Sequence, residues 1–493
     1  MKKKLIALFS AVTVLSSTGM LAACGDGSDH DLTIAFLSGG RGETYVGALV
    51  EAFEQTTWAQ EYLTANEKES LDVEIIPGGG GVIEDSVRNA INSDNTPDVL
   101  FLNYNMQNST TEAFVRARQL VDLTDLLKEN VYGEETTLGD KLVPGLLSNY
   151  TTQPYGDGHT YTLPAFYSPT GLWYDASRFY DDGKGDEYTP AGTGENAGKY
   201  ELPKTWAEFW ALGDYLNTQN GNLSSVTGNT PALFTYPTAG YFDGFIYSAV
   251  AGMAGTDKFM QMLGYADGIW EDEDVQDALE IVVRLKDYLE PNTVAQANTD
   301  GFQQNQQAVI GSADGTTKGT ALFVPNGDWL PGEMAKSTPE GYEWGFMPLP
   351  SKDDNTMSYV NTYLENVYLH TDGSNIDLAK QFLLFYYSDQ GAAIVAREAS
   401  AIIPTQDALE NAKANGISDS TIDLYNAYDG NGAVSGSFAA TNTVTGVIWN
   451  DVLYNDLNTN VFGATTGSTA ELLAAWTEKL ESASDQYRAQ IIK

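Results

Sequence analysis

The sequence predicts an α/β fold built around parallel strands. Three short apolar segments, at residues 32–38, 71–81 and 97–105, have the composition of strands. Segments with the apolar spacing of helices lie between them, at residues 45–63 and 82–92. Strands that alternate with helices pair in parallel, and ligands bind beyond the carboxyl ends of such strands. We therefore expect a site near the residues that follow each strand.

A second α/β region follows residues 161–175, which read YTLPAFYSPTGLWYD. Residues 181–201 are polar and rich in glycine, as expected of an insertion loop. Pro203 and Thr205 then introduce a predicted helix that carries two tryptophans on its packed face. Further amphipathic helices are predicted in three later segments, at residues 275–290, 378–399 and 471–492.

The N-terminus has the layout of an export signal. Three lysines at residues 2–4 precede an apolar segment with small residues toward its end. The tetrapeptide at residues 21–24, Leu-Ala-Ala-Cys, resembles the bacterial lipobox, in which the signal is cut before the cysteine and the thiol is acylated. We expect residues 1–23 to be a lipoprotein signal, Cys24 to be lipidated and residues 24–31 to form a tether.

Two alternatives concern the same segment. The first is an ordinary signal peptide in which the cysteine is incidental. The second is a transmembrane anchor, which the polar residues within the apolar run disfavour. Because Cys24 is the only cysteine of 493 residues, the mature chain can have neither a disulfide nor a cysteine nucleophile.

The net charge of the chain limits the charge of the ligand that it can bind. The chain has 67 acidic and 26 basic residues, a formal net charge of −41. Such a field repels nucleic acids and anionic ligands, so we expect a neutral or cationic one. Aromatic residues are numerous, with 28 Tyr, 9 Trp and 19 Phe. Tyr and Trp suit sites where a ring face is apolar and its rim must form hydrogen bonds.

Several enzyme signatures are missing from the sequence. The three histidines lie far apart, so there is no HExxH zinc motif, and no Gly-x-Ser-x-Gly elbow occurs. The acidic clusters at residues 181–182 and 271–274 do not match an EF-hand and are expected to be solvated, with a loosely bound calcium left open. We expect no enzyme activity, no cofactor and no metal. A carboxylate pair for glycoside hydrolysis stays open as an alternative.

The order of several motifs resembles a known family. A strand with a proline leads to Trp-Tyr-Asp and then to Pro-x-Thr-Trp-x-Glu-Phe, within residues 161–209. Matching segments follow in order at residues 319–334, 344–351 and 378–409. This order is similar to that of extracellular solute-binding proteins of family 1, the sugar-capturing subunits of ABC importers, which are related to maltose-binding protein. The resemblance spans nearly the whole mature chain.

The resemblance implies a two-lobed periplasmic-binding-protein-like fold of type II, with hinge strands and a ligand cleft between the lobes. Carried over, residues 32–163 and 361–403 form lobe 1, and residues 164–360 and 404–493 form lobe 2. It also implies a small-molecule carbohydrate ligand, ABC permease subunits as partners, a monomer, and a location on the extracellular face of the cell membrane through the lipid anchor.

The resemblance also places ligand contacts on particular residues. They follow strand ends, lie on the hinge strands or belong to aromatic motifs of the family: Arg41, Glu43, Asn103, Tyr104, Asn105, Tyr167, Ser168, Tyr241, Asp243, Trp329, Asn361, Tyr363 and Glu365. Trp329, in the NGxW motif, would stack on a sugar ring. The acid that usually follows the hinge proline is missing, which leaves the particular sugar open.

Each of these residues also has a purely structural interpretation. Trp329 could be a core residue, Arg41 could pair with Glu43, and Tyr241 and Asp243 could serve as a helix cap or in packing. For the whole protein, the leading hypothesis is a lipid-anchored receptor for a neutral carbohydrate, expected to be an oligosaccharide. The alternatives are a secreted glycoside hydrolase or lyase, a surface adhesin, and a binder of a polyol, peptide or cation on the same fold.

Overall fold

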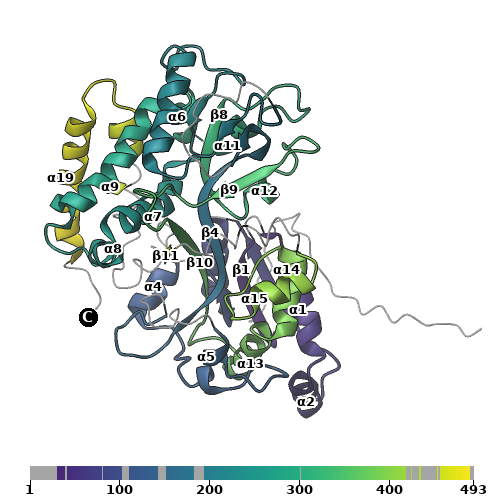
Figure 1. The fold of residues 1–493 in the computed structure, drawn as a ribbon. Helices are drawn as coiled ribbons and strands as arrows, with labels where there is room; N and C mark the ends of the chain where they lie inside the picture. The colour runs from purple at the N-terminus through teal and green to yellow at the C-terminus, as the bar shows by residue number, and fades with distance from the viewer. Residues whose placement is uncertain are drawn as a thin grey trace, which may run out of the picture.

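The computed structural model describes residues 30–38, 41–79, 81–102, 110–142, 152–181, 194–299, 301–417, 424, 432–434, 452–453 and 456–488. They form two α/β lobes that are joined by two long strands (Figure 1). The fold class predicted from the sequence is therefore confirmed. Cys24 and the preceding apolar segment lie outside the described residues.

The first lobe contains the three strands that the sequence predicts. β1 (Leu32–Leu37) pairs in parallel with both β2 (Val73–Gly78) and β3 (Val99–Phe101). α3 (Gly81–Asn92) crosses from β2 to β3. The remaining helices of this lobe are α1 (Thr44–Glu54), α2 (Thr57–Ala65), α4 (Thr110–Ala117), α5 (Leu138–Lys141), α13 (Ile376–Tyr386), α14 (Asp389–Ala399) and α15 (Ala408–Ala414).

Two helices predicted as single elements are each divided in two. The predicted helix at residues 45–63 is α1 followed by α2, because the Thr56 side chain accepts a hydrogen bond from the backbone N–H of Ala59 and starts a new helix. Likewise, Ser388 caps α14 by accepting from the N–H of Gly391, so residues 378–399 form α13 and α14. Both predictions of one continuous helix were wrong.

Two long antiparallel strands connect the lobes. β4 (Thr162–Asp175) pairs with β10 (Tyr359–Leu369) along most of its length. β10 also pairs with β3 of the first lobe, whereas β4 pairs with β8 (Ala321–Gly327) of the second. One sheet in the order β2-β1-β3-β10-β4-β8-β7 therefore runs through the whole molecule.

The second lobe contributes β7, β8 and β9 to this sheet and contains its own set of helices. β7 (Ala232–Phe234) pairs with β8, and β9 (Trp344–Met347) pairs with β4. Its main helices are α6 (Trp206–Gln219), α7 (Phe242–Ala254), α8 (Thr256–Leu263), α9 (Glu273–Arg284), α10 (Thr293–Ala297), α11 (Phe302–Ile310), α12 (Leu330–Glu333) and α19 (Thr469–Arg488). Three further strands are short: β5 (Phe179–Tyr180) and β6 (Tyr200–Glu201), which pair with each other, and β11 (Gly432–Val434), which pairs with β10.

The hydrophobic core is divided in the same way as the lobes. Along β4, Phe166 belongs to the core of the first lobe and Leu172 to that of the second. The two expected lobe boundaries at residues 163/164 and 360/361 both lie within the connecting strands. A third boundary was expected after residue 403. However, α15 packs against α14 through Ala408 and Ala412, so this helix lies on the first lobe.

Within the described parts of the chain, no helix combines the length and the apolar character needed to cross a lipid bilayer.

Candidate ligand-binding cleft

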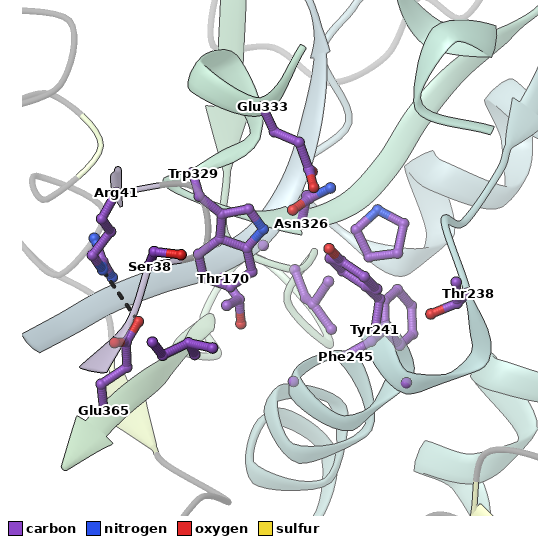
Figure 2. Close-up of a pocket in the computed structure, with 16 residues that line it drawn as sticks. Ser38, Arg41, Thr170, Thr238, Tyr241, Phe245, Asn326, Trp329, Glu333 and Glu365 are labelled. Atoms are coloured by element: carbon purple, nitrogen blue, oxygen red, sulfur yellow. Dashed lines mark hydrogen bonds and ion pairs between the residues drawn. The ribbon is translucent and has the colours of Figure 1, made fainter. Parts of the chain in front are cut away.

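A cavity of about 340 Å³ lies between the lobes (Figure 2). The carboxyl end of β1 contributes Leu37 and Ser38 from the first lobe. The connecting strands contribute Thr170 and Glu365, and the carboxyl end of β8 contributes Asn326 from the second lobe. The cavity therefore lies beyond strand ends, where α/β sheets bind ligands.

Two half-buried aromatic rings form one wall of the cavity. Trp329 lies at the start of α12 and Tyr241 just before α7. Their ring centroids are 6.4 Å apart, and the ring planes are inclined by 56°. Phe245, on the first turn of α7, lies beside them in the cavity wall (Figure 2). Together these rings offer apolar faces to a flat ligand.

The position of the Trp329 ring depends on a glycine. A Cβ atom on Gly327 would lie 2.2 Å from Cζ3 of Trp329, much closer than two carbon atoms can approach. The indole ring therefore folds back over the end of β8, where a residue with a side chain would displace it.

A buried amide offers a free donor to the cavity. Asn326 is 2% exposed, and its Oδ1 accepts from the backbone N–H of Gly327 over 2.9 Å. Within the described residues, Asn326 Nδ2 has no acceptor. Because a buried N–H without a partner costs free energy, this group favours a ligand oxygen as its acceptor.

A carboxylate faces the same space. Glu333, on α12, points into the cavity (Figure 2) and accepts a hydrogen bond from Gln306 Nε2 over 2.8 Å. Burial raises the pKa of Glu333, and the Gln306 hydrogen bond opposes this rise. In its charged form, this carboxylate can accept hydrogen bonds from ligand hydroxyls.

The cation of the cavity is held in a buried ion pair. Arg41 Nε donates to Glu365 Oε1 over 3.1 Å, and Arg41 Nη2 donates to Ser168 Oγ over 2.8 Å. The guanidinium carbon also lies 4.5 Å from the centroid of the Phe166 ring. Burial raises the pKa of Glu365, and the charge of Arg41 opposes this rise. Arg41 thereby fastens the loop after β1 to both connecting strands.

The structure brings four of the predicted contact residues together. Arg41, Tyr241, Trp329 and Glu365 all line the cavity. Arg41 pairs here with Glu365, while Glu43 is exposed at the N-cap of α1 and is not among the lining residues.

Two other predicted residues lie behind the cavity wall. Ser168 accepts from Arg41, and Asn361 Nδ2 donates to Thr170 Oγ1 over 3.0 Å. They support lining residues instead of lining the cavity themselves.

The remaining predicted contacts cannot be placed by their side chains. Asn103, Tyr104 and Asn105 lie outside the described residues. Only the backbone is described for Tyr167 on β4, Asp243 on α7 and Tyr363 on β10.

Several lining residues were not predicted. The polar ones are Ser38, Thr170, Thr238, Asn326 and Glu333. The sequence contains features that could have predicted two of them. Asn326 is the first residue of the NGxW motif, and Glu333 lies four residues, or about one helical turn, after the tryptophan of that motif.

A group of acidic side chains in the second lobe resembles a cation site by composition. One carboxylate oxygen from each of Asp267, Glu481 and Asp485 lies within 4.8 Å of the others. The guanidinium of Arg488 forms ion pairs with all three, at 3.5, 3.7 and 2.9 Å respectively. Their charge is therefore partly compensated by the protein itself.

Comparisons with known proteins agree with this architecture. A model of the family described as bacterial extracellular solute-binding protein matches residues 52–393. The diacetylchitobiose binding protein DasA of Streptomyces coelicolor is 25% identical over 421 residues, which cover 84% of this chain and 85% of the relative.

Two solved structures share the fold. The bacterial solute receptor AcbH, described as exclusively preferring β-D-galactopyranose, has a TM-score of 0.61 at 13% identity, covering 92% of this chain and 99% of its own. A chitin oligosaccharide binding protein has a TM-score of 0.59 at 15% identity, covering 90% of this chain and 95% of its own. At these identities the structural likeness establishes the fold.

Proposed function

Because the chain belongs to the family of bacterial extracellular solute-binding proteins, we propose that it captures a neutral carbohydrate between its lobes and delivers it to the permease of an ABC importer. The observation that carries this proposal is the cavity between the lobes, which combines the aromatic wall of Tyr241 and Trp329 with buried polar groups. The protein acts by binding and release, without chemical conversion of its ligand.

The composition of the cavity matches the two surfaces of a sugar. The C–H faces of a sugar ring are apolar and suit the aromatic rings, whereas its hydroxyls need donors and acceptors. Asn326 supplies a donor and Glu333 an acceptor, while Ser38, Thr170 and Thr238 supply hydroxyl groups.

The charges of the cavity argue against an anionic ligand. Among the residues that the structure describes, the charged side chains that line it are Arg41, Glu333 and Glu365. Since Arg41 already pairs with Glu365, its charge is compensated before a ligand enters. The net charge of −41 for the whole chain acts in the same direction. The relative and the structural neighbours are named for sugar ligands, which supports the same class.

Titration calorimetry with neutral saccharides tests this proposal. We expect binding heat with at least one member of a panel of xylo-, manno-, malto- and chito-saccharides, each tested as monosaccharide and as oligomers. Enzymatic release of sugar from the corresponding polysaccharides, measured in parallel, should be absent. If no saccharide of the panel produced heat, the carbohydrate proposal would be wrong.

We further propose that the mature protein is held at the extracellular face of the membrane by a lipid on Cys24. The lipobox-like sequence before this cysteine supports this location. Cys24→Ala should release the protein into the medium or leave the signal uncleaved, while the affinity for the ligand stays the same. A Cys24→Ala protein that was still cleaved and still sedimented with membranes would contradict the anchor.

A further inference from the structure

A second cavity adjoins the first. It has a volume of about 370 Å³, and both Trp329 and Arg41 belong to the walls of both cavities. Its other walls come from both lobes. Asp328 precedes α12 and Gly332 lies within it on the second lobe, and Ser400 lies at the end of α14 on the first lobe. The space between the lobes therefore continues past the Trp329 ring.

The second cavity also has an aromatic wall. Trp344 on β9 is half-buried and packs edge-to-face against Trp173, with ring centroids 5.6 Å apart, and against Tyr342, at 4.8 Å. These contacts fix the indole ring of Trp344 in the cavity wall. A ring held in this way offers an apolar face at a small cost in conformational entropy.

Polar groups accompany this wall. Trp173, which lines the cavity and is 1% exposed, has an indole N–H with no acceptor among the described residues. Ser400 has a left-handed backbone conformation, with φ of 48°, and its side chain is exposed in the cavity wall. The second cavity thus repeats the composition of the first: a fixed aromatic ring, a buried donor without a partner and a hydroxyl group.

We propose that the second cavity is a second ring-binding site, so that the ligand is a saccharide of at least two rings with one ring on each side of Trp329. This inference rests on the proposed carbohydrate function and specifies the length of its ligand. Each cavity alone has a volume near the lower end of the range for small-molecule sites, roughly 300–1,000 Å³. Trp329, shared by both walls, is the side chain that would contact both rings.

The experiment compares mono- and disaccharides of the same sugar. The probes are glucose with maltose, xylose with xylobiose, and N-acetylglucosamine with diacetylchitobiose. In the protein without substitutions, the disaccharide of the recognised sugar should bind at least tenfold more tightly than its monosaccharide. A monosaccharide too weak to measure satisfies this expectation, provided that its disaccharide binds.

Two substitutions alter the second cavity in opposite ways. Gly332→Phe fills it from an exposed position of α12, and Trp344→Ala removes its aromatic wall. Both should reduce the affinity for the disaccharide about tenfold, toward that for the monosaccharide. Where the monosaccharide binds measurably, its affinity should change less than twofold. Ala335→Phe is the matched control, because Ala335 is exposed just after α12 and lines neither cavity. It should leave both affinities unchanged.

The outcomes separate this inference from the proposed function. If monosaccharides and disaccharides bind equally well, or if Gly332→Phe and Trp344→Ala spare the disaccharide, the second site is wrong while carbohydrate binding stands. The same holds if folded Gly332→Phe lowers both affinities equally, because the two cavities would then be one site. If no saccharide binds the unsubstituted protein, the proposed function fails and the second site fails with it.

Discussion

Trp329 can face the cleft because Gly327, two positions earlier, has no side chain. The ring occupies the space where a Cβ atom of that residue would lie. A motif of four residues therefore contains both the aromatic ring and the space that the ring needs. The same motif contains Asn326, a lining residue whose Oδ1 accepts from the N–H of Gly327 and whose Nδ2 has no acceptor among the described residues.

Gly327→Ala should move the ring without removing it. We expect a loss of ligand binding of about 1 kcal/mol or more, since a central aromatic anchor loses its position. The free energy of unfolding should fall by roughly 1–3 kcal/mol, as for an overpacked site. Calorimetry and urea unfolding measure these two quantities. An unchanged affinity in the folded variant would show that the ring position is unimportant.

We expect His370, just after β10, to make the free energy of unfolding depend on pH. It is 1% exposed, and its Nδ1 accepts from the backbone N–H of Asp372 over 3.1 Å. Burial lowers the pKa of His370, and the charge of Asp372 opposes this effect. The folded state thus holds the neutral imidazole, while the unfolded chain takes up a proton near pH 6.5.

The free energy of unfolding should therefore fall as the pH drops through about 6.5, because protons bind preferentially to the unfolded chain. His370→Gln isolates this effect, since all other titrating groups are the same in both proteins. We expect the stability advantage of histidine over glutamine to shrink between pH 8 and pH 5.5, measured by urea unfolding. An advantage that grew in acid would contradict the neutral imidazole.

At the residue scale, the sequence predicts the parts of the site that belong to recognisable motifs. Arg41, Tyr241 and Trp329 were placed by family motifs, and all three line the cavity. Thr170 was missed because its orientation depends on the pairing of the connecting strands. That pairing shifts register between Glu365 and Asn366, and a shift of this kind leaves no clear signal in the residues themselves.

At the element scale, the strands were predicted better than the helix boundaries. β1 and β3 are short, buried and almost entirely apolar, which is the composition of parallel strands covered on both faces. The helices at residues 45–63 and 378–399 keep their apolar spacing across Thr56 and Ser388, so periodicity alone does not reveal the break. The hydrogen bond formed by each capping side chain determines where the new helix begins.

The start of α6 is also fixed by hydrogen bonds of its cap. Thr205 Oγ1 accepts from the N–H of Glu208 over 3.3 Å, and Glu208 Oε2 accepts from the N–H of Thr205 over 3.0 Å, which makes a reciprocal capping box. α6 carries Trp206, Phe209 and Trp210 into the core of the second lobe.

Thr205→Ala should lower the free energy of unfolding by about 1 kcal/mol, because it leaves an amide of the first turn without its acceptor. Chemical unfolding measures the change, and Thr205→Ser serves as the control that keeps the hydroxyl group. If the alanine and serine variants were equally stable, the cap would have no energetic role.

At the scale of the whole molecule, the two lobes share one sheet but have separate cores. The polar segment of β4 around Ser168 and Thr170 separates Phe166 in one core from Leu172 in the other. In the described sheet, β4 and β10 are the two strands that run from one lobe to the other, and they are hydrogen-bonded to each other there. The architecture can therefore bend there, as hinged binding proteins do when they close on a ligand.

The two-lobed arrangement itself was predicted from the order of motifs, and the family match over residues 52–393 confirms that resemblance. The exact path between the lobes could not be predicted in the same way. Whether α15 packs on the first or the second lobe depends on contacts of Ala408 and Ala412 with α14, and small apolar residues of this kind suit either core.

We propose that the ligand lies between the lobes, against the ring of Trp329. Calorimetric titration of the protein and of Trp329→Ala with the tightest-binding saccharide tests this position. We expect clear binding heat for the unsubstituted protein and a loss of a few kcal/mol for the variant, as for a central aromatic anchor. Trp58→Ala, in α2 and outside both cavities, should keep full affinity. Equal affinities of the unsubstituted protein and a folded Trp329→Ala would show that the ligand does not bind against this ring.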